Sequence, residues 1–252
     1  MAGEKLLLEI SAGVAVVTLN RPRVRNALDM ALVDELRTCL HELGTSADLE
    51  VCILTGSGPA FCAGADLKQR LNMTASEQVT HTEGILECAN LLEQLPVPVI
   101  AAVNGAAYAG GLELALACDV RIAAAGATFA FPEVSLGIFP GAGGPIRLPR
   151  LVGRGWARLM IFSGEPVGAD EALRIGLVER VVSAQALMDE AMGLAVRIAA
   201  NSRTGVRAAK RLMNSGGEMS FTAAIALSNA LRHPLSGTAE STEGLDRFNR
   251  KV

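Results

Sequence analysis

The alternation of apolar and polar residues in the first part of the chain predicts strands and helices in turn. Residues 6–10 and 14–20 are rich in apolar and branched side chains at the spacing of strands. Leucines recur at helical spacing over residues 28–43, and the following glycine predicts that this helix ends near residue 44. A short apolar run at 51–56, followed by a Gly-Ser-Gly-Pro turn, indicates a buried strand.

Farther along the chain, helices alternate with strands at first and then predominate. We expect a helix over 76–94, a strand over 99–103, a helix over 110–118 and a strand over 119–124. The remainder, from about residue 145, is nearly all helical: helices are expected at 153–162, 169–174, 185–200, 203–214, 219–231 and 239–249, with one strand at 178–182. Because paired strands precede single helices, the order differs from the strict alternation of a doubly wound sheet.

One stretch has the length of a membrane span. Residues 97–118 are largely apolar, but Pro98, Asn104, Glu113 and three glycines interrupt them. A buried strand, a glycine turn and a buried helix explain this stretch better, so we expect no membrane insertion.

Composition narrows the class of protein. Of the 252 residues, 50% are hydrophobic and 19% are charged, which allows a large core and argues against disorder. A net charge of −3 gives no general attraction to nucleic acid or to anionic membranes. The five scattered cysteines include no CxxC pair, which is typical of structural thiols in a reducing compartment.

The N-terminal sequence MAGEKLLLEI has neither the basic start of a secretory signal nor the arginine-rich character of a transit peptide. We therefore expect a cytoplasmic protein, or a mitochondrial matrix protein if the chain is a processed eukaryotic one.

Several common sites are not indicated. The glycines at 141–144 have neither the GxGxxG nor the P-loop spacing, and residues 56–58 do not fit a GxSxG elbow. The three histidines, His41, His81 and His233, lie far apart without ligand spacing, so we expect no metal site.

Two carboxylates are candidates for acid–base chemistry. Glu113 in GGLELALACD and Glu133 in FPEVSLG lie in uncharged surroundings beside glycine-rich turns. Glu113 could instead be a first-turn acid at the positive end of a helix, and Glu133 an exposed loop residue. Burying a carboxylate is costly, however, and the resulting pKa shift can serve chemistry.

Backbone groups form a second candidate feature. Residues 62–68 (CAGADLK) and 107–113 (AYAGGLE) place small side chains where helices are expected to begin. Exposed N–H groups at such points suit an anion or a developing oxyanion. Close packing of helix on sheet would require the same small residues.

Six segments in one order resemble the enoyl-CoA hydratase/isomerase family, the crotonase superfamily. They are TLNRPRVRNAL (18–28), FCAGADLK (61–68), PVIAAVNGAAYAGGLELALACDVRIA (98–123), FPEVSLGIFPGAGG (131–144), RLPRLVG (147–153) and EGLDRFNRK (243–251). The resemblance covers nearly the whole chain.

The resemblance implies an α/β fold: a crotonase-like spiral of ββα units over residues 1–190 and a helical C-terminal region over 191–252. That region would form a homotrimer, or a hexamer made of two trimers. The implied activity is hydration of a trans-2-enoyl-CoA thioester to a 3-hydroxyacyl-CoA. Coenzyme A is then part of the substrate, and no separate cofactor is expected.

The resemblance also implies roles for particular residues. The backbone N–H groups of Ala65 and Gly110 match the oxyanion hole, Glu113 matches the carboxylate that activates water, and Glu133 matches the one that exchanges the proton at C2. The implied contacts with the acyl-CoA are Ala63, Asp66, Leu67 and Lys68, the basic residues Arg23 and Arg25, and Phe248 and Lys251 from a neighbouring subunit. Arg23 and Arg25 could equally form an exposed basic turn.

Two positions depart from the family pattern. Ala109 replaces the first of three glycines, and Pro145-Ile146 replaces Thr-Gln at a predicted helix start. The family also includes Δ3,Δ2-enoyl-CoA isomerases and other lyases that form enolates, so these activities remain alternatives.

Non-enzymatic alternatives also remain, namely a non-catalytic acyl-CoA-binding protein or an RNA-binding relative. The latter would use Arg203, Arg207, Lys210 and Arg211, but at helical spacing a solvated helix face explains these residues better. We therefore expect no nucleic-acid partner.

Overall fold

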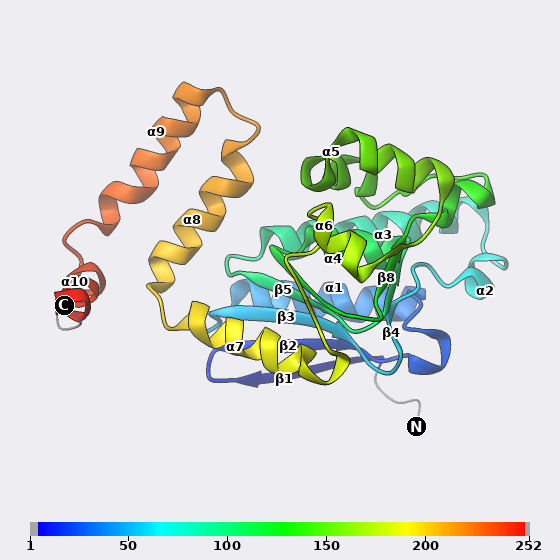
Figure 1. Ribbon diagram of the computed structural model, residues 1–252, viewed down its shortest axis with the longest axis horizontal. Coiled ribbons are helices and arrows are strands. Elements are labelled where there is room, and N and C mark those ends of the chain that lie inside the picture. The colour runs from blue at the N-terminus through cyan, green and yellow to red at the C-terminus, as the bar shows by residue number, and fades with distance from the viewer. Residues whose placement is uncertain (1–4, 250–252) are drawn as a thin grey trace.

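In the computed structural model, which describes residues 5–249, the strands are divided between two sheets (Figure 1). The larger sheet has six strands in the order β1-β2-β3-β5-β7-β10. These strands are β1 Leu6–Ser11, β2 Val14–Leu19, β3 Val51–Gly56, β5 Val99–Val103, β7 Val120–Ala124 and β10 Arg180–Val182. β1 and β2 pair antiparallel, and each further neighbour pairs parallel.

The second sheet contains four short strands in the order β4-β6-β8-β9. They are β4 Ala60–Cys62, β6 Ala106–Tyr108, β8 Thr128–Ala130 and β9 Val167–Gly168. The pairs β3–β4, β5–β6 and β7–β8 each place their first strand in the large sheet and their second in the small one, and helices follow each pair. The spiral of ββα units implied by the resemblance is therefore confirmed.

Ten helices accompany the sheets in the described part of the chain. They are α1 Met30–Thr45, α2 Leu67–Arg70, α3 Ala75–Gln94, α4 Gly110–Ala117, α5 Gly144–Ser163, α6 Ala169–Arg174, α7 Leu187–Ala199, α8 Arg203–Gly216, α9 Phe221–Arg232 and α10 Ala239–Asn249. Short 3-10 turns lie at η1 Pro22–Val24, η2 Pro132–Leu136, η3 Ala184–Ala186 and η4 His233–Leu235.

Most expected helices are found within a few residues of their expected ends, but α5 is not. It begins at Gly144, whereas the pattern predicted a start at residue 153. Pro149 lies inside the helix and Gly153 has non-helical dihedral angles (φ 75°, ψ 164°), so the periodic pattern becomes regular only after this kink.

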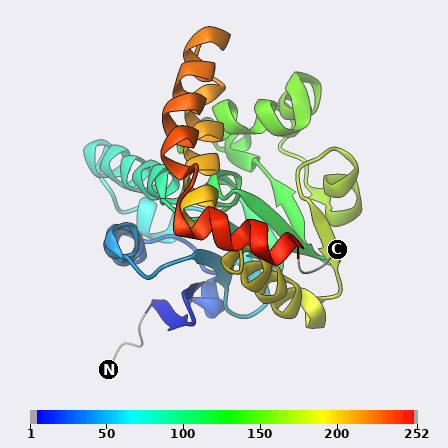
Figure 2. The same cartoon turned by 90° about the vertical axis from the view of Figure 1, so that its left-hand side faces the viewer.

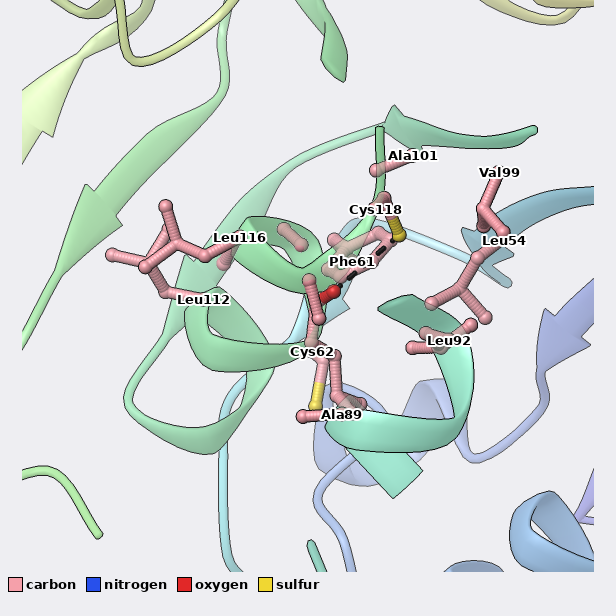
Figure 3. Packing of buried hydrophobic residues seen from close by; sticks show 14 of the residues in the cluster. Leu54, Phe61, Cys62, Ala89, Leu92, Val99, Ala101, Leu112, Leu116 and Cys118 are labelled. Carbon is pink, nitrogen blue, oxygen red and sulfur yellow. Dashed lines mark hydrogen bonds between the residues drawn. The ribbon is translucent and has the colours of Figure 1, made fainter. Parts of the chain in front are cut away.

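The large sheet is covered on both faces because its central strands send alternate side chains to each side. On β3, Cys52 and Leu54 join the cluster beneath α1, α3 and α4, whereas Val51 and Ile53 join the cluster beneath α7. Figure 3 shows part of the first cluster around Phe61. Each fully buried large aliphatic side chain contributes about 1.5–3 kcal/mol to stability.

Several expectations from composition can now be compared with the structure. All five cysteines are free and buried, as expected of structural thiols. Within residues 5–249 no helix has the length and hydropathy needed to cross a bilayer. The same residues contain no group of three or more His, Cys, Asp or Glu side chains that could hold a metal ion.

The last three helices extend from one end of the sheet, where α8 lies beside α9 and α10 crosses below them (Figure 2). α8 is anchored to residues that precede strands: Arg203 pairs with Glu50 at 2.5 Å, and Lys210 pairs with Asp119 at 2.7 Å. The expected solvated face is therefore wrong for Lys210, which is only 4% exposed. The Arg203 side chain remains 39% exposed beside Glu50, and Arg211 is exposed.

The division of the chain at residues 190 and 191 stays a prediction. That point lies within α7, whose Leu187, Ala191 and Ala195 pack on the large sheet.

Candidate active site

Two loops that follow short strands touch because one of them contains a glycine. Gly64 has φ +87°, and a Cβ placed on it would lie 2.6 Å from the Ala109 Cβ and 3.2 Å from the Gly110 nitrogen. A larger residue at position 64 would push the two loops apart. The segment after β4 is thereby held against the start of α4.

Hydrogen bonds fix the orientation of the peptide at Ala65. The Leu28 N–H donates to the Gly64 carbonyl at 2.8 Å, and the Asp66 N–H donates to the Leu28 carbonyl at 2.9 Å. In this parallel bridge between Leu28 and Ala65, the Ala65 N–H points away from Leu28. Gly110 is the first residue of α4, so its N–H has no acceptor within the helix.

Ala65 and Gly110 both line a cavity of about 420 Å³. Its other walls include Ala63 before α2, Leu67 at the start of α2, Ile85 on α3, Glu113 on α4, and residues on and after η2, among them Glu133 and Ala142. Apart from a few polar groups the lining is apolar, which suits a ligand with a hydrocarbon portion.

Glu113 is held in this cavity by the start of another helix. Its side chain is 3% exposed, and its Oε1 accepts the N–H groups of Ala142 at 2.7 Å and Gly144 at 2.8 Å. Burial raises the pKa of Glu113, while the two N–H groups and the nearby Arg147 oppose that rise. Glu113 lies in the first turn of α4, as the alternative of an acid at the positive end of a helix required. Its carboxylate is nevertheless bound by residues at and before the start of α5.

Glu133 is buried without such support. The residue is 7% exposed on η2, and its Oε2 is buried with no hydrogen-bond partner among the described residues. Burial, supplemented by repulsion from Glu113, raises the pKa of Glu133 to about 7. The alternative of an exposed loop residue is therefore wrong, and the two predicted carboxylates share one cavity.

The other predicted site residues fall into three groups. Ala63 and Leu67 line the cavity, and the Ala63 N–H donates to the Arg25 carbonyl at 2.9 Å. Lys68, Arg23 and Arg25 are exposed and do not line the cavity. Phe248 is exposed on α10 at the other end of the protein (Figure 1), and Lys251 lies outside the described residues.

Asp66 has a structural role in addition to its predicted contact with the acyl-CoA. Its Oδ1 accepts the N–H groups of Lys68 at 3.1 Å and Gln69 at 3.3 Å, so it caps α2. Its Oδ2 pairs with Arg21 at 3.0 Å. Both carboxylate oxygens are thus engaged within the chain, and the residue does not line the cavity.

Sequence reasoning missed two polar side chains in the cavity wall, Arg70 at the end of α2 and Thr82 on α3. The Arg70 Nη1 donates to the Thr82 Oγ1 at 3.2 Å. The helix α2 has only four residues, so no periodic pattern indicated where its side chains point.

Ala109 adopts a backbone conformation that glycine prefers, with φ 52° and ψ −128°. Such a conformation costs a residue with a Cβ on the order of 1–3 kcal/mol. The departure from three glycines thus places a strained residue directly before Gly110. Pro145 lies in the first turn of α5, which agrees with the helix start inferred from this proline and not with the start at residue 153 inferred from the periodic pattern.

Comparison with known proteins identifies the family. The family model for enoyl-CoA hydratase/isomerase matches residues 9–252. The chain is 39% identical over 252 residues to the crotonyl-CoA hydratase of Syntrophomonas wolfei, covering 100% of this chain and 97% of the relative. It is 40% identical over 249 residues to the short-chain-enoyl-CoA hydratase of Clostridium acetobutylicum, covering 98% and 95%.

A solved structure is similarly close. The enoyl-CoA hydratase from Bacillus anthracis superposes with a TM-score of 0.96 at 40% identity, over 98% of this chain and 97% of that one.

Proposed function

Because the chain belongs to the enoyl-CoA hydratase/isomerase family, we propose that it hydrates a trans-2-enoyl-CoA to a 3-hydroxyacyl-CoA. The names of its relatives, a crotonyl-CoA hydratase and a short-chain-enoyl-CoA hydratase, support hydration as the reaction. The observation that carries the proposal is the placement of two buried carboxylates in one cavity with Ala65 and Gly110. Hydration needs one group to activate water and another to protonate carbon.

The N–H groups of Ala65 and Gly110 receive the thioester oxygen. When water adds to C3, negative charge moves from the double bond onto this oxygen. A prealigned donor at such an oxygen typically contributes about 3 kcal/mol to transition-state stabilisation. The N-terminal end of α4 adds a favourable dipole because Gly110 is its first residue.

Glu113 acts as the base. Its Oε1 is engaged by Ala142 and Gly144, so Oε2 takes a proton from water while the water oxygen bonds to C3. The two N–H groups stabilise the ionised form that a base requires. Glu133 acts as the acid, because a carboxyl group with a pKa of about 7 still holds its proton near neutrality. It transfers that proton to C2, and the enolate electrons form the new C–H bond.

This assignment distinguishes hydration from isomerisation. Moving a double bond from C3 to C2 requires one group that shuttles a proton, whereas water addition uses both. The burial of Glu113 in the same cavity as Glu133 therefore favours hydration.

The direct test is incubation with trans-2-enoyl-CoAs of short and long chains. We expect loss of the absorbance of the conjugated thioester and formation of the 3-hydroxyacyl-CoA. The variant Ala65→Pro lacks one donor, so kcat should fall about 10²–10³-fold. A protein that isomerises 3-enoyl-CoA but adds no water, or a folded Ala65→Pro variant with unchanged turnover, would contradict the mechanism.

The remaining site residues are assigned to the coenzyme A portion of the substrate. Ala63, Leu67 and Lys68 lie beside the Ala65 amide, and Arg23 and Arg25 provide positive charge on the adjoining turn for phosphate groups. Asp66 acts indirectly by holding the peptide that contains Ala65.

We also infer that the chain forms a trimer or a hexamer. Met213, Phe221, Leu245 and Phe248 on the last three helices are each more than half exposed in the single chain, which a partner subunit would cover. Light scattering should report three or six copies. A stable monomer at micromolar concentration would exclude contributions of Phe248 and Lys251 to a neighbouring site.

A further inference from the structure

The cavity contains a cation that the proposed chemistry does not use. Its charged lining residues are Glu113, Glu133 and Arg70. The two glutamates are assigned to proton transfer, whereas Arg70 stands at the α2–α3 side among apolar residues and Thr82.

Arg70 lacks the partner that shielded arginines usually have. Within residues 5–249 no carboxylate lies within 4.0 Å of its guanidinium, whose one side-chain partner is the neutral Thr82 hydroxyl at 3.2 Å. That hydroxyl in turn donates to the Gln78 carbonyl at 2.9 Å. By contrast, Arg21, Arg121 and Arg147, which are also shielded, each pair with a carboxylate. A guanidinium offers five N–H groups, so most of its donor capacity remains available.

The location of Arg70 relative to the glutamates defines which part of a substrate it would meet. The proposed function places Glu133 at C2 and Glu113 at C3. Glu113 is bound by the Ala142 N–H, and the preceding Gly141 touches Thr82, whose Cγ2 would lie 2.6 Å from a Cβ at position 141. Arg70 bonds to that threonine. Contacts therefore lead from Glu113 through Gly141 and Thr82 to Arg70, and we take this path as the direction of the acyl chain beyond C3.

We propose that Arg70 binds a carboxylate at the far end of the acyl chain, so that the preferred substrates are 2-enoyl-CoA thioesters of dicarboxylic acids. This inference rests on the proposed function for the direction of the chain. A guanidinium binds a carboxylate through two parallel charge-assisted hydrogen bonds, and the shielded position strengthens them. A methyl-terminated chain would leave the guanidinium without a directly paired carboxylate in a largely apolar wall.

Kinetics on matched substrates test the proposal. Two trans-2-enoyl-CoAs of equal length are compared, one ending in a methyl group and one in a carboxylate, at chain lengths of six and eight carbons. The wild type should show a kcat/KM about tenfold to a hundredfold higher for the carboxylate at one of these lengths, mostly through KM. Arg70→Met should abolish or reverse this preference, and Arg70→Lys should retain part of it. Arg37→Met, which removes an exposed arginine of α1, is the control and should leave the preference unchanged.

Two outcomes would overturn the proposal. One is equal kcat/KM for both members of each pair in the wild type. The other is a uniform loss with every substrate in Arg70→Met, which would place Arg70 on the coenzyme A phosphates instead.

Calorimetry separates this inference from the proposed function. Binding of saturated acyl-CoAs with methyl and carboxylate ends needs no turnover, and Arg70 should again favour the carboxylate. If the wild type hydrates neither enoyl thioester, the proposed function fails, while the binding comparison still decides the role of Arg70.

Discussion

Glu113 and Glu133 are the same residue type in the same cavity, yet the structure surrounds them differently. Glu113, in the first turn of α4, receives two backbone N–H groups from around the start of α5 and lies near the Arg147 guanidinium. Glu133, on η2, has a buried oxygen with no partner in the described chain. Burial raises both pKa values. At Glu113 the N–H groups of Gly144 and Ala142 and the charge of Arg147 oppose the rise, whereas at Glu133 a hydrogen bond from its own backbone opposes it and repulsion from Glu113 adds to it. Burial therefore raises the pKa of a carboxyl group toward neutrality, and the hydrogen bonds that the group accepts determine whether it acts as a base or as an acid.

Removing either carboxylate should have the largest effect. Glu113→Gln deprives water of its base and Glu133→Gln removes the proton for C2, so each should lower kcat for hydration about 10²–10⁴-fold with little change in acyl-CoA binding. Timed assays with product analysis measure kcat for each variant, and titration with acyl-CoA measures its binding. Glu42→Gln, which changes an exposed glutamate on α1, should retain full activity. Wild-type rates in both variants would show that the two glutamates are structural.

Gly144→Ala should disturb Glu113 while leaving Glu133 in place. An added Cβ would lie 2.8 Å from the Phe131 ring and 3.1 Å from the Glu113 Oε1, so the N–H groups that hold this carboxylate must shift. We expect kcat to fall about tenfold to a hundredfold, as for a catalytic group displaced by a fraction of an ångström. Gly155→Ala on the same helix is the matched control, because a Cβ there meets nothing within 4 Å. Equal losses in the two variants would mean that the effect comes from α5 as a whole.

The pH dependence should report the two carboxyl groups separately. Glu133 must be protonated, so kcat/KM should fall about tenfold per pH unit once the pH rises above about 7. Glu113 must be ionised, so activity should also fall at acid pH, below the raised pKa of this residue. A profile that stays flat from mildly acid to mildly alkaline pH would refute this assignment of acid and base.

Arg147→Met should have a smaller effect, confined to Glu113. The Arg147 side chain donates to the Ala142 carbonyl at 3.1 Å and pairs with Glu93 at 2.6 Å, so it holds the loop that binds Glu113. Without it, the pKa of Glu113 should rise, the acid limb of the pH profile should move to higher pH, and kcat should fall by about threefold to tenfold. Arg150→Met, one turn along and exposed, should leave the profile unchanged. A shift of the alkaline limb instead would contradict the assignment.

Much of the fold could be predicted from the sequence because its long elements have clear periods. The leucines of α1 and the apolar run of β3 needed no tertiary information. The strands β4, β6 and β8 could not be found in this way, because three residues are too few to show a period. Their pairing depends on contacts between residues far apart in the chain.

The candidate site was predictable in part and for a different reason. Glu113 and Glu133 were singled out by their uncharged surroundings, and the family resemblance supplied their partners Ala65 and Gly110. The N–H groups that hold Glu113 depend on the left-handed Gly143 (φ 98°) next to them, which tertiary packing imposes. Arg70 was missed because only the folded chain brings α2 and α3 together around the cavity.

The anchoring of α8 has a consequence for local opening of the chain. Lys210 and Arg203 tie this helix to the residues before β3, β5 and β7, whereas α9, which the structure describes in full, buries none of its residues. Segments with few buried contacts open at free energies well below that of global unfolding. In an isolated chain, the amide hydrogens of α9 should therefore exchange with solvent earlier than those of α8, and the boundary between slow and fast exchange should fall near Gly217.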